Sequence, residues 1–390
     1  MGETGLHASE FPRRATNRQQ LAIADRGEQS SINSDNDARR CDSTLPSHSS
    51  RCSEADDGSS LSSPGGGKAK MSEQLLIIDT DVGIDDALAL MLALANPDKC
   101  KILAITCVAG NVELSKVYTN VLRILNYCKK LQIPVYQGCS RPLVQKGIHC
   151  TVFHGQDGLG GASEKLPMPT DDLEPPKEHA SVAMVELVQK HPGALTLVAL
   201  GPLTNVALAQ RLDTTFLSNL KELVIMGGTF EGRGNETPTG EFNFTCDPEA
   251  ASVVLNEVDC KARIVTYEPC QDHLLDWDWF ETWVGGPSKM AQLVRAMTEH
   301  PAQRQREVLQ RQGFMSCDLL AMASVLSPAL ILHRERFPAW VELHGATTRG
   351  MLVVDRRPSI KWHHGKQPNV EFLLRFNMEG LKDLYARMLE

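Results

Sequence analysis

The sequence predicts an α/β protein with one mostly parallel, open β-sheet flanked by helices, a Rossmann-like arrangement. Strand-like apolar runs alternate with helix-like segments, and glycines stand where strands end. The first strand-like run is continuously apolar, which is typical of a strand covered on both faces. No internal repeat is visible, so these elements are assigned to a single sheet.

A strand, a tight turn and a helix are predicted over residues 75–97, LLIIDTDVGIDDALALMLALANP. Residues 75–78 form the apolar run, residues 87–95 are strong helix formers, and Pro97 ends the helix. Gly83 allows a positive φ or a close backbone approach at the turn. Four carboxylates surround this glycine: Asp79, Asp81, Asp85 and Asp86.

These clustered acids predict a metal site. Open α/β sheets bind ligands at the carboxyl ends of their strands, where this turn lies. Like charges so close together need a cation or shared protons, and carboxylate oxygens suit Ca²⁺ or Mg²⁺. Capping of the helix by Asp85 and Asp86 explains one or two of the acids, but not four. An EF-hand is excluded because its twelve-residue spacing and closing glutamate are missing.

The remaining elements follow in alternation. Further strands are predicted over residues 101–109, 133–136, 195–200, 222–226 and 262–267. Helices are predicted over residues 113–130, 180–190 and 287–312, after Asn205, and from Asp247 and Asp318 onward. Residues 146–162 and the segment before residue 246 are predicted to be loops, and the last 50 residues strands closed by a helix. Trp277 and Trp279 are expected to pack a helix on the sheet rather than to line a pocket.

Composition restricts the class of protein. The chain has 390 residues and a formal net charge of −8, which argues against binding nucleic acid by phosphate neutralisation. No apolar run approaches the ~20 residues of a membrane helix. Eleven cysteines are scattered without a CxxC pair, and no signal peptide is visible, so we expect a cytoplasmic protein with reduced thiols.

Residues 1–70 differ from the rest of the chain. They are rich in Ser, Arg, Asp and Glu and contain one aromatic residue, Phe11. Such a segment buries too little apolar surface to fold. We therefore expect a disordered polar tail over residues 1–70 and a folded domain over residues 71–390.

Several motifs stand in a fixed order over residues 74–390. They are Asp79-Thr-Asp81-Val-Gly83-Ile-Asp85-Asp86-Ala87, Gly110-Asn111, Gly201-Pro-Leu-Thr-Asn205, Met226-Gly-Gly228, Glu241-Phe-Asn243 and Asp247-Pro-Glu-Ala250. Together they resemble the inosine–uridine nucleoside hydrolase family. Enzymes of that family cleave the N-glycosidic bond of ribonucleosides, giving ribose and free base, with a tightly held Ca²⁺. The resemblance thus implies a catalytic domain that acts in nucleoside salvage.

The resemblance implies a metal site and a catalytic base. Asp81, Asp86, the backbone carbonyl of Leu200 and Asp318 would bind the Ca²⁺. Asp81 would also activate the attacking water, and Asn111 would orient it. Calcium lowers the pKa of a bound water, which fits these roles.

The resemblance also implies a set of residues around the substrate. An anionic pocket stabilises the oxocarbenium-like sugar of the transition state. Met226 is equally compatible with the core, and Asn235 with an ordinary turn. Phe242, in an extended segment, is expected to point away from its two neighbours, toward the core. The implied substrate-binding residues are Asp85, Met226, Asn235, Glu241, Phe242 and Asn243. The implied assembly is a homodimer or homotetramer, with a small-molecule substrate and no nucleic-acid or membrane partner.

This sequence departs from the family pattern at the residue before Asp318. Well-studied relatives carry a histidine there, whereas this chain has Cys317. A thiol of ordinary pKa is a poor acid toward a purine nitrogen. Three alternatives remain open: His154, which matches a family histidine near the base, His273, or departure of the base through water. For His273 a structural or surface role is favoured, because no partner can be placed beside it.

Two other functions remain open at this point. A haloacid-dehalogenase-type phosphatase also ends an apolar strand in Asp-x-Asp and binds Mg²⁺ between carboxylates. It expects Thr or Val at Gly83, however, and gives no reason for Asp85 and Asp86. A catalytically silent relative that binds nucleoside or calcium is the second alternative, which Cys317 keeps open.

Overall fold

The computed structural model describes residues 73–169, 176–357 and 367–390. The predicted tail, residues 1–70, lies outside these ranges. Within them, no helix is long and apolar enough to cross a membrane, and all nine cysteines are free thiols.

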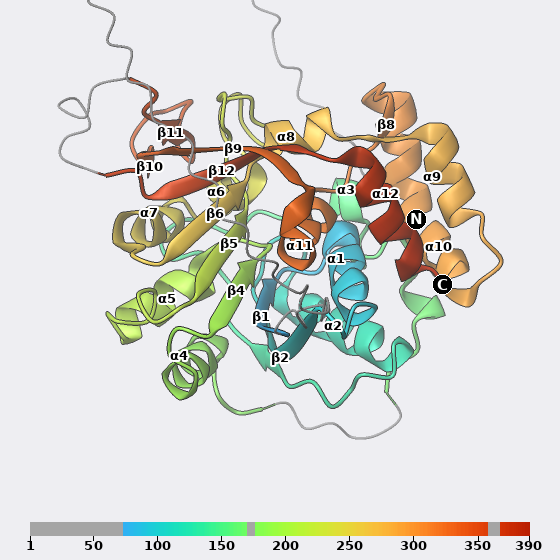
Figure 1. The fold of residues 1–390 in the computed structure, drawn as a ribbon, viewed down its shortest axis with the longest axis horizontal. Coiled ribbons are helices and arrows are strands. Elements are labelled where there is room, and N and C mark those ends of the chain that lie inside the picture. Colours follow the sequence, from blue (N-terminus) through green and yellow to red (C-terminus); the bar gives the residue numbers. More distant parts are fainter. Residues whose placement is uncertain (1–72, 170–175, 358–366) are drawn as a thin grey trace, which may run out of the picture. The chain divides into compact units, whose positions relative to one another are not determined.

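An eight-stranded sheet forms the centre of the domain (Figure 1). Seven strands are parallel, and β9 pairs antiparallel with β12 at one edge, so the predicted α/β architecture is confirmed. In sheet order the strands are β3 (Val135–Gln137), β2 (Cys100–Cys107), β1 (Gln74–Thr80), β4 (Leu195–Ala199), β5 (Glu222–Met226), β6 (Lys261–Val265), β12 (Val370–Phe376) and β9 (Ile331–Phe337). Two small antiparallel pairs accompany it, β10 (Ala339–Val341) with β11 (Leu352–Val354) and β7 (Leu275–Asp276) with β8 (Gly313–Phe314).

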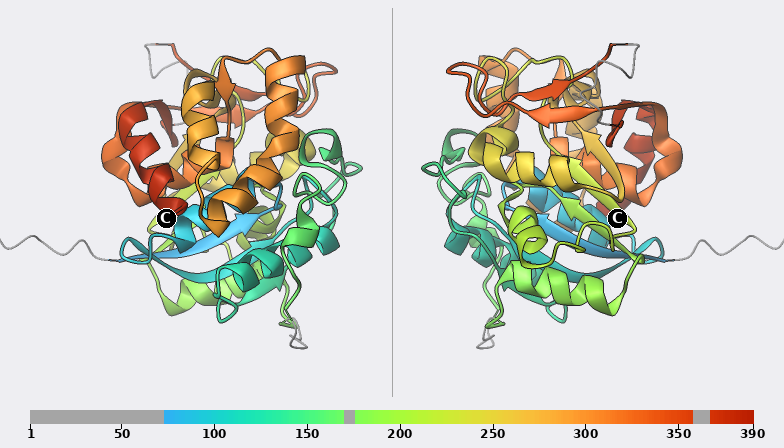
Figure 2. Two further views of the ribbon diagram at one scale, coloured as in Figure 1. Left: turned by 90° about the vertical axis from the view of Figure 1, so that its right-hand side faces the viewer. Right: turned by 90° about the vertical axis from the view of Figure 1, so that its left-hand side faces the viewer.

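Helices cover both faces of this sheet, as the two side views of Figure 2 show. On one face lie α4 (Ala180–Lys190), α5 (Thr204–Leu212) and α7 (Pro248–Glu257). On the other lie α1 (Ile84–Leu94), α2 (Leu114–Tyr127), α9 (Trp277–Val284), α10 (Lys289–Gln303), α11 (Cys317–Leu326) and α12 (Met378–Met388). Leu76 and Ile78 of β1 pack into the second of these cores and Ile77 into the first, because successive side chains of a strand point to opposite faces.

The strand order reverses at β1, which places a crevice at its carboxyl end. β1 pairs with β2 on one side and with β4 on the other. The chain leaves β1 for α1 on one face and leaves β4 for α5 on the opposite face. In open α/β sheets, ligands bind where the connections diverge in this way.

Two predicted loops contain short helices. Within residues 146–162 lies α3 (Thr151–His154), where His154 is buried, so this segment is not a loop throughout, as was predicted. The segment before residue 246 contains α6 (Phe242–Cys246), and α8 (Tyr267–Asp272) directly follows β6. The expectation of an extended Phe242 was therefore wrong, because Glu241 accepts hydrogen bonds from backbone N–H groups at the start of a helix.

The long predicted helix over residues 287–312 is shorter than expected. α10 ends at Gln303 and is followed by a π-helical turn, Arg304–Val308, that leads to β8. Trp277 and Trp279 pack against the hydrophobic core on this face of the sheet, which confirms that they pack a helix.

Candidate active site

The acids of the first turn converge because β1 ends and α1 begins within five residues. Asp79 and Thr80 are the last residues of β1, and Asp85 and Asp86 belong to the first turn of α1. Gly83 precedes the helix with a φ of −92°, so its need for glycine is one of space. A Cβ at this position would clash with the His154 ring and lie 2.8 Å from Nδ2 of Asn111.

Hydrogen bonds from the turn and from Asn111 orient two of the acids. Oδ2 of Asp81 accepts from the Asn111 N–H at 2.7 Å. Oδ1 of Asp86 accepts from the Thr80 hydroxyl at 2.6 Å, and its Oδ2 accepts from the Gly83 N–H and from Nδ2 of Asn111, both at 3.0 Å. Asn111 thus bridges Asp81 and Asp86.

Buried oxygens without donors mark the place where a cation fits. Oδ1 of Asp81 and Oδ1 of Asp318 are buried, and no donor among the described residues reaches them. Burial, reinforced by neighbouring carboxylates, raises the pKa of both groups well above the ordinary range. Oxygens of Asp85, Asp86 and Asp318 lie within 4.8 Å of one another and could hold a metal ion. The donor set, all carboxylate oxygen, fits a hard divalent cation.

Only some of the predicted metal ligands belong to this group of three carboxylates. Asp86 and Asp318 belong to it, and Asp85 takes the place expected for Asp81. Asp81 is in hydrogen-bond contact with Asp86 and is fully buried. The carbonyl of Leu200, at the end of β4, accepts from Nδ2 of Asn243 at 2.7 Å and keeps a second lone pair.

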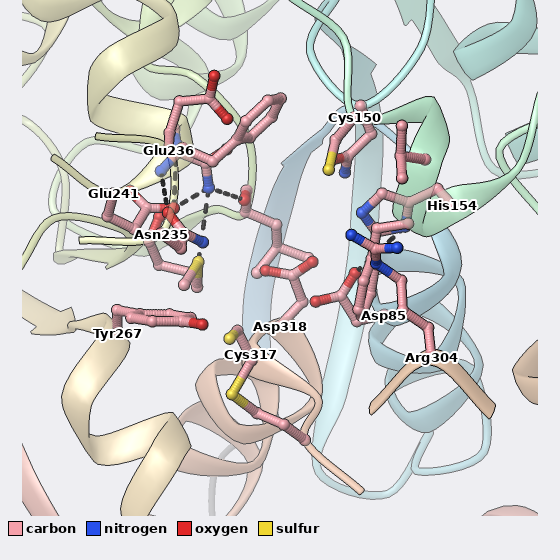
Figure 3. A pocket seen from close by; sticks show the side chains of 18 of the residues that line it. Asp85, Cys150, His154, Asn235, Glu236, Glu241, Tyr267, Arg304, Cys317 and Asp318 are labelled. Atoms are coloured by element: carbon pink, nitrogen blue, oxygen red, sulfur yellow. Dashed lines mark hydrogen bonds and ion pairs between the residues drawn. The ribbon is translucent and has the colours of Figure 1, made fainter. Parts of the chain in front are cut away.

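A cavity of about 570 Å³ opens above the acids (Figure 3). Asp81 and Asp86 are fully buried and are not part of its lining. The other site residues that the resemblance implies line it: Asp85, Asn111, His154, Leu200, Met226, Asn235, Glu241, Phe242, Asn243 and Asp318. Asp79, the first acid of the cluster, does not line it, because its Oδ1 accepts from the Thr106 hydroxyl at 2.7 Å and from Nδ2 of Asn205 at 2.8 Å.

Polar groups on the β5 side of the cavity are held firmly. Glu241 accepts from the N–H groups of Gly228 at 2.7 Å and Asn243 at 3.0 Å, and burial raises its pKa to about 7. Oδ1 of Asn235 accepts from the Phe242 N–H at 2.8 Å, so Asn235 shapes its turn as well as the cavity wall. These contacts fix carboxyl and amide groups on the wall before any substrate enters.

The two candidate histidines have different surroundings. Nδ1 of His154 accepts from the Ile84 N–H at 3.0 Å, so a proton is carried by Nε2, and burial lowers the pKa of the ring to about 4. His154 is therefore a neutral hydrogen-bond donor and not an imidazolium acid near neutral pH. Nε2 of His273 accepts from the Phe376 N–H at 2.9 Å, and His273 does not line the cavity. The favoured structural role of His273 is thus confirmed.

Comparison with known proteins identifies the family. The family model described as inosine-uridine preferring nucleoside hydrolase matches residues 76–383. The chain belongs to this family. This membership makes the chain a ribonucleoside hydrolase, an N-glycosidase, and removes the phosphatase alternative.

Relatives of this nucleoside hydrolase match most of its length. It is 34% identical over 286 residues to the inosine-uridine preferring nucleoside hydrolase of Leishmania major, covering 72% of this chain and 88% of the relative. It is 33% identical over 321 residues to a pyrimidine-specific ribonucleoside hydrolase of Salmonella typhimurium, covering 81% of this chain and 98% of the relative. A solved inosine–guanosine nucleoside hydrolase superposes with a TM-score of 0.74 at 31% identity, covering 81% of this chain and 99% of that one.

Several lining residues of this nucleoside hydrolase were not predicted. Tyr267 lies two residues after the end of β6, and the rule that ligands meet strand ends could have found it. Arg304 and Arg311 lie in and after the π-helical turn, which no sequence pattern indicates. The Cys317 thiol lines the cavity and is in hydrogen-bond contact with Cys270. The other lining residues missed were His149, Cys150, Val152, Phe153, Glu236, Leu309 and Met315.

Proposed function

We propose that this nucleoside hydrolase cleaves ribonucleosides of the inosine–uridine type to ribose and free base, in nucleoside salvage, with Ca²⁺ as its metal. The observation that carries the proposal is a cluster of buried acids at the point where the strand order reverses, open to a cavity of about 570 Å³. The names of the relatives mention inosine, uridine, guanosine and pyrimidines. Ribose is common to all these substrates, which is consistent with a site whose polar groups face a sugar.

The metal would be held by Asp81, Asp86, Asp318 and the carbonyl of Leu200, with Asp85 beside it. Oδ1 of Asp81 and Oδ1 of Asp318 have no donor among the described residues, so both are available as ligands. When bound, Ca²⁺ supplies Lewis-acid chemistry and neutralises the clustered carboxylates.

The protein side chains supply the remaining steps. Asp81 takes a proton from the attacking water, and Asn111, fixed between Asp81 and Asp86, orients that water. Asp85 lies beside the ribose 2′- and 3′-hydroxyls, and the anionic pocket stabilises the positive charge of the sugar in the transition state. Asn235, Glu241 and Asn243 hold ribose hydroxyls beside Met226, which lowers the entropic part of the barrier.

Product analysis tests this function. The protein is incubated with inosine, uridine and a phosphate monoester, with and without a chelator, and free ribose and phosphate are measured. We expect ribose from the nucleosides, loss of its release in chelator, and recovery with Ca²⁺. Release of phosphate, or nucleoside binding without ribose, would refute the proposal; the second result would identify a silent relative.

The Asp81→Ala variant tests the catalytic base. Loss of a proton acceptor and metal ligand should lower turnover by several orders of magnitude. Turnover within about tenfold of the parent would contradict the role of Asp81.

Three further proposals rest on the sequence: the first two on its composition, and the third on the family resemblance. The catalytic domain would span residues 71–390 after a polar tail of residues 1–70. The protein would act in the cytoplasm as a homodimer or homotetramer. Light scattering of the purified protein tests the assembly, since a monomeric mass would exclude both forms.

A further inference from the structure

The cavity contains a hydroxyl–guanidinium pair that the proposed function has not used. Tyr267 and Arg311 both line it, together with Phe153, Phe242, Leu309 and Met315. These aromatic and apolar side chains suit a planar base, whereas the carboxyl and amide groups suit the sugar. Tyr267 and Arg311 are polar groups that line the same cavity, so they are available to act on the leaving base.

The backbone of the sheet holds Tyr267 in place. It is the first residue of α8, two residues after the end of β6, and its N–H donates to the Gly228 carbonyl at 3.1 Å. The side chain is buried, with 6% of the residue exposed. Figure 3 shows its hydroxyl directed toward Cys317, into the cavity.

Arg311 determines the direction of the phenolic proton. Its Nη2 donates to the Tyr267 hydroxyl oxygen at 2.6 Å, and its guanidinium carbon lies 5.9 Å from the ring centroid. A guanidinium only donates, so the phenol oxygen accepts this bond and the phenol proton points elsewhere. Among the described residues, no acceptor takes that proton. Arg311 is itself anchored, because its carbonyl accepts from Nε1 of Trp277 at 2.9 Å.

Other donors near the base have weaker claims. His154 is neutral, with Nδ1 occupied by the Ile84 N–H, so its remaining N–H is a hydrogen-bond donor only. Cys317, which stands where the family histidine was expected, is in contact with the Cys270 thiol. Tyr267 is the hydroxyl donor of the lining whose oxygen is bonded to a cation. Burial raises the pKa of its phenol, and the Arg311 guanidinium offsets part of this rise because it stabilises the phenolate formed when the proton leaves.

We propose that Tyr267 is the catalytic residue that protonates the leaving base, and that Arg311 is the positioning residue that directs and stabilises it. This inference rests on the proposed hydrolase function. The C1′–N bond breaks, its electron pair goes to the base nitrogen, and the Tyr267 proton moves onto the base. Water adds to C1′ and gives one proton to Asp81, and that proton returns through solvent to the Tyr267 phenolate.

A comparison of two leaving groups tests the proposal. The parent and Tyr267→Phe are assayed with inosine and uridine, and with 4-nitrophenyl β-D-ribofuranoside, whose leaving group departs without protonation. Loss of a general acid should lower kcat on the nucleosides by about 10²–10⁴-fold. On the nitrophenyl riboside kcat should stay within about threefold of the parent, and KM should change little on either. Arg311→Gln should show the same selectivity with a smaller loss.

Matched variants control for structural effects. Tyr127→Phe removes a tyrosine hydroxyl that donates to the Lys289 carbonyl at 2.9 Å, outside the cavity lining. Arg306→Gln removes an arginine that pairs with Glu281 on the surface. Neither should change the ratio of the two rates, and all variants should melt within a few degrees of the parent.

Each result decides between the proposals. Equal losses on both leaving groups, or no loss on either, would overturn the role of Tyr267 while leaving the hydrolase function intact. The inference requires the parent to cleave both substrates, so failure on the nitrophenyl riboside alone would also overturn it. A parent that releases no ribose from inosine or uridine would overturn both proposals.

Discussion

Replacing Asp81 by asparagine should raise the stability of the metal-free protein and lower the turnover of the enzyme. Asp81 is fully buried, and burial together with the charge of Asp86 raises its pKa well above the ordinary range. Asparagine has nearly the same shape, and its oxygen can accept from the Asn111 N–H as Oδ2 of Asp81 does at 2.7 Å. The variant therefore removes a charge without leaving a cavity, and should stabilise the metal-free protein.

The size of this effect follows from the repulsion within the acid cluster. Two unit charges about 4 Å apart repel by about 4 kcal/mol at an effective dielectric constant of about 20. Asp81 and Asp86 are in hydrogen-bond contact and share protons, so we expect only ~1–3 kcal/mol of this repulsion to be recovered. At ~2–4 °C per kcal/mol, the Tm of Asp81→Asn in chelator should rise by ~2–12 °C.

Excess Ca²⁺ should reverse the order of the two melting temperatures, so that the parent melts above Asp81→Asn. At about 100 times its Kd, a ligand adds ~2.7 kcal/mol to the free energy of unfolding. The parent should gain this stabilisation in excess Ca²⁺, whereas Asp81→Asn, which lacks one carboxylate ligand, should gain little. In excess Ca²⁺, turnover of the variant should be lower than that of the parent by several orders of magnitude.

Scanning calorimetry with EDTA or with excess CaCl₂, near pH 7.5, measures both effects. Asp213→Asn is the control, because a backbone hydrogen bond from Thr215 and a side-chain bond from Gln189 lower the pKa of Asp213. Removing that charge should not raise the Tm. If Asp81→Asn melts at or below the parent temperature in EDTA, the repulsion argument is wrong.

Other perturbations test the wall, the core and the tail. Burial raises the pKa of Glu241 from 4.5 to about 7, so the folded protein keeps a proton that the unfolded chain has released, and stability should fall as pH rises through this window. Glu241→Gln should flatten that fall in melting curves recorded between those pH values, and an unchanged slope would refute the assignment. Glu222→Ala leaves the buried Arg263 without the carboxylate that lies 2.8 Å away, so it should lower the free energy of unfolding by ~3–5 kcal/mol in urea titrations. Lys261→Ala removes the exposed partner of Glu222 and should lower it by less than ~1 kcal/mol. A chain beginning at Met71 should melt within error of the full chain, because the composition of residues 1–70 offers nothing to dock; a clear drop in Tm would show that the tail packs on the domain.

Elements with a continuous pattern could be predicted closely from the sequence. The strand predicted over residues 222–226 is β5, Glu222–Met226, because its apolar run ends abruptly at two glycines. The helix predicted over residues 180–190 is α4, Ala180–Lys190. The rule that parallel strands deliver ligands at their carboxyl ends placed the acids of the first turn, and the resemblance added Leu200 and Met226. In the structure Asp85, Leu200 and Met226 line one cavity.

The missed features depend on contacts between distant segments. α6 has five residues, too few for a periodic pattern, and its one local signal was the capping Glu241. Arg304 and Arg311 come to the cavity because the chain after α10 turns through a π-helical segment, held by the side chain of Gln305 against the backbone of Met315. Tertiary packing specifies such a turn, so no local sequence pattern predicts it.

The acid cluster itself argues for an active enzyme over a silent relative. Oδ1 of Asp81 and Oδ1 of Asp318 are buried without donors, and no structural need of the sheet explains them, since the flanking α1 and α11 are otherwise apolar where they pack. A fold keeps such destabilising charge where a cation or a transition state uses it. Binding of nucleoside alone would require hydrogen bonds to the sugar, which the amides of Asn235 and Asn243 offer without any buried repulsion. On the proposal that Tyr267 protonates the base, the cavity keeps an acid although Cys317 stands where the resemblance implies a histidine.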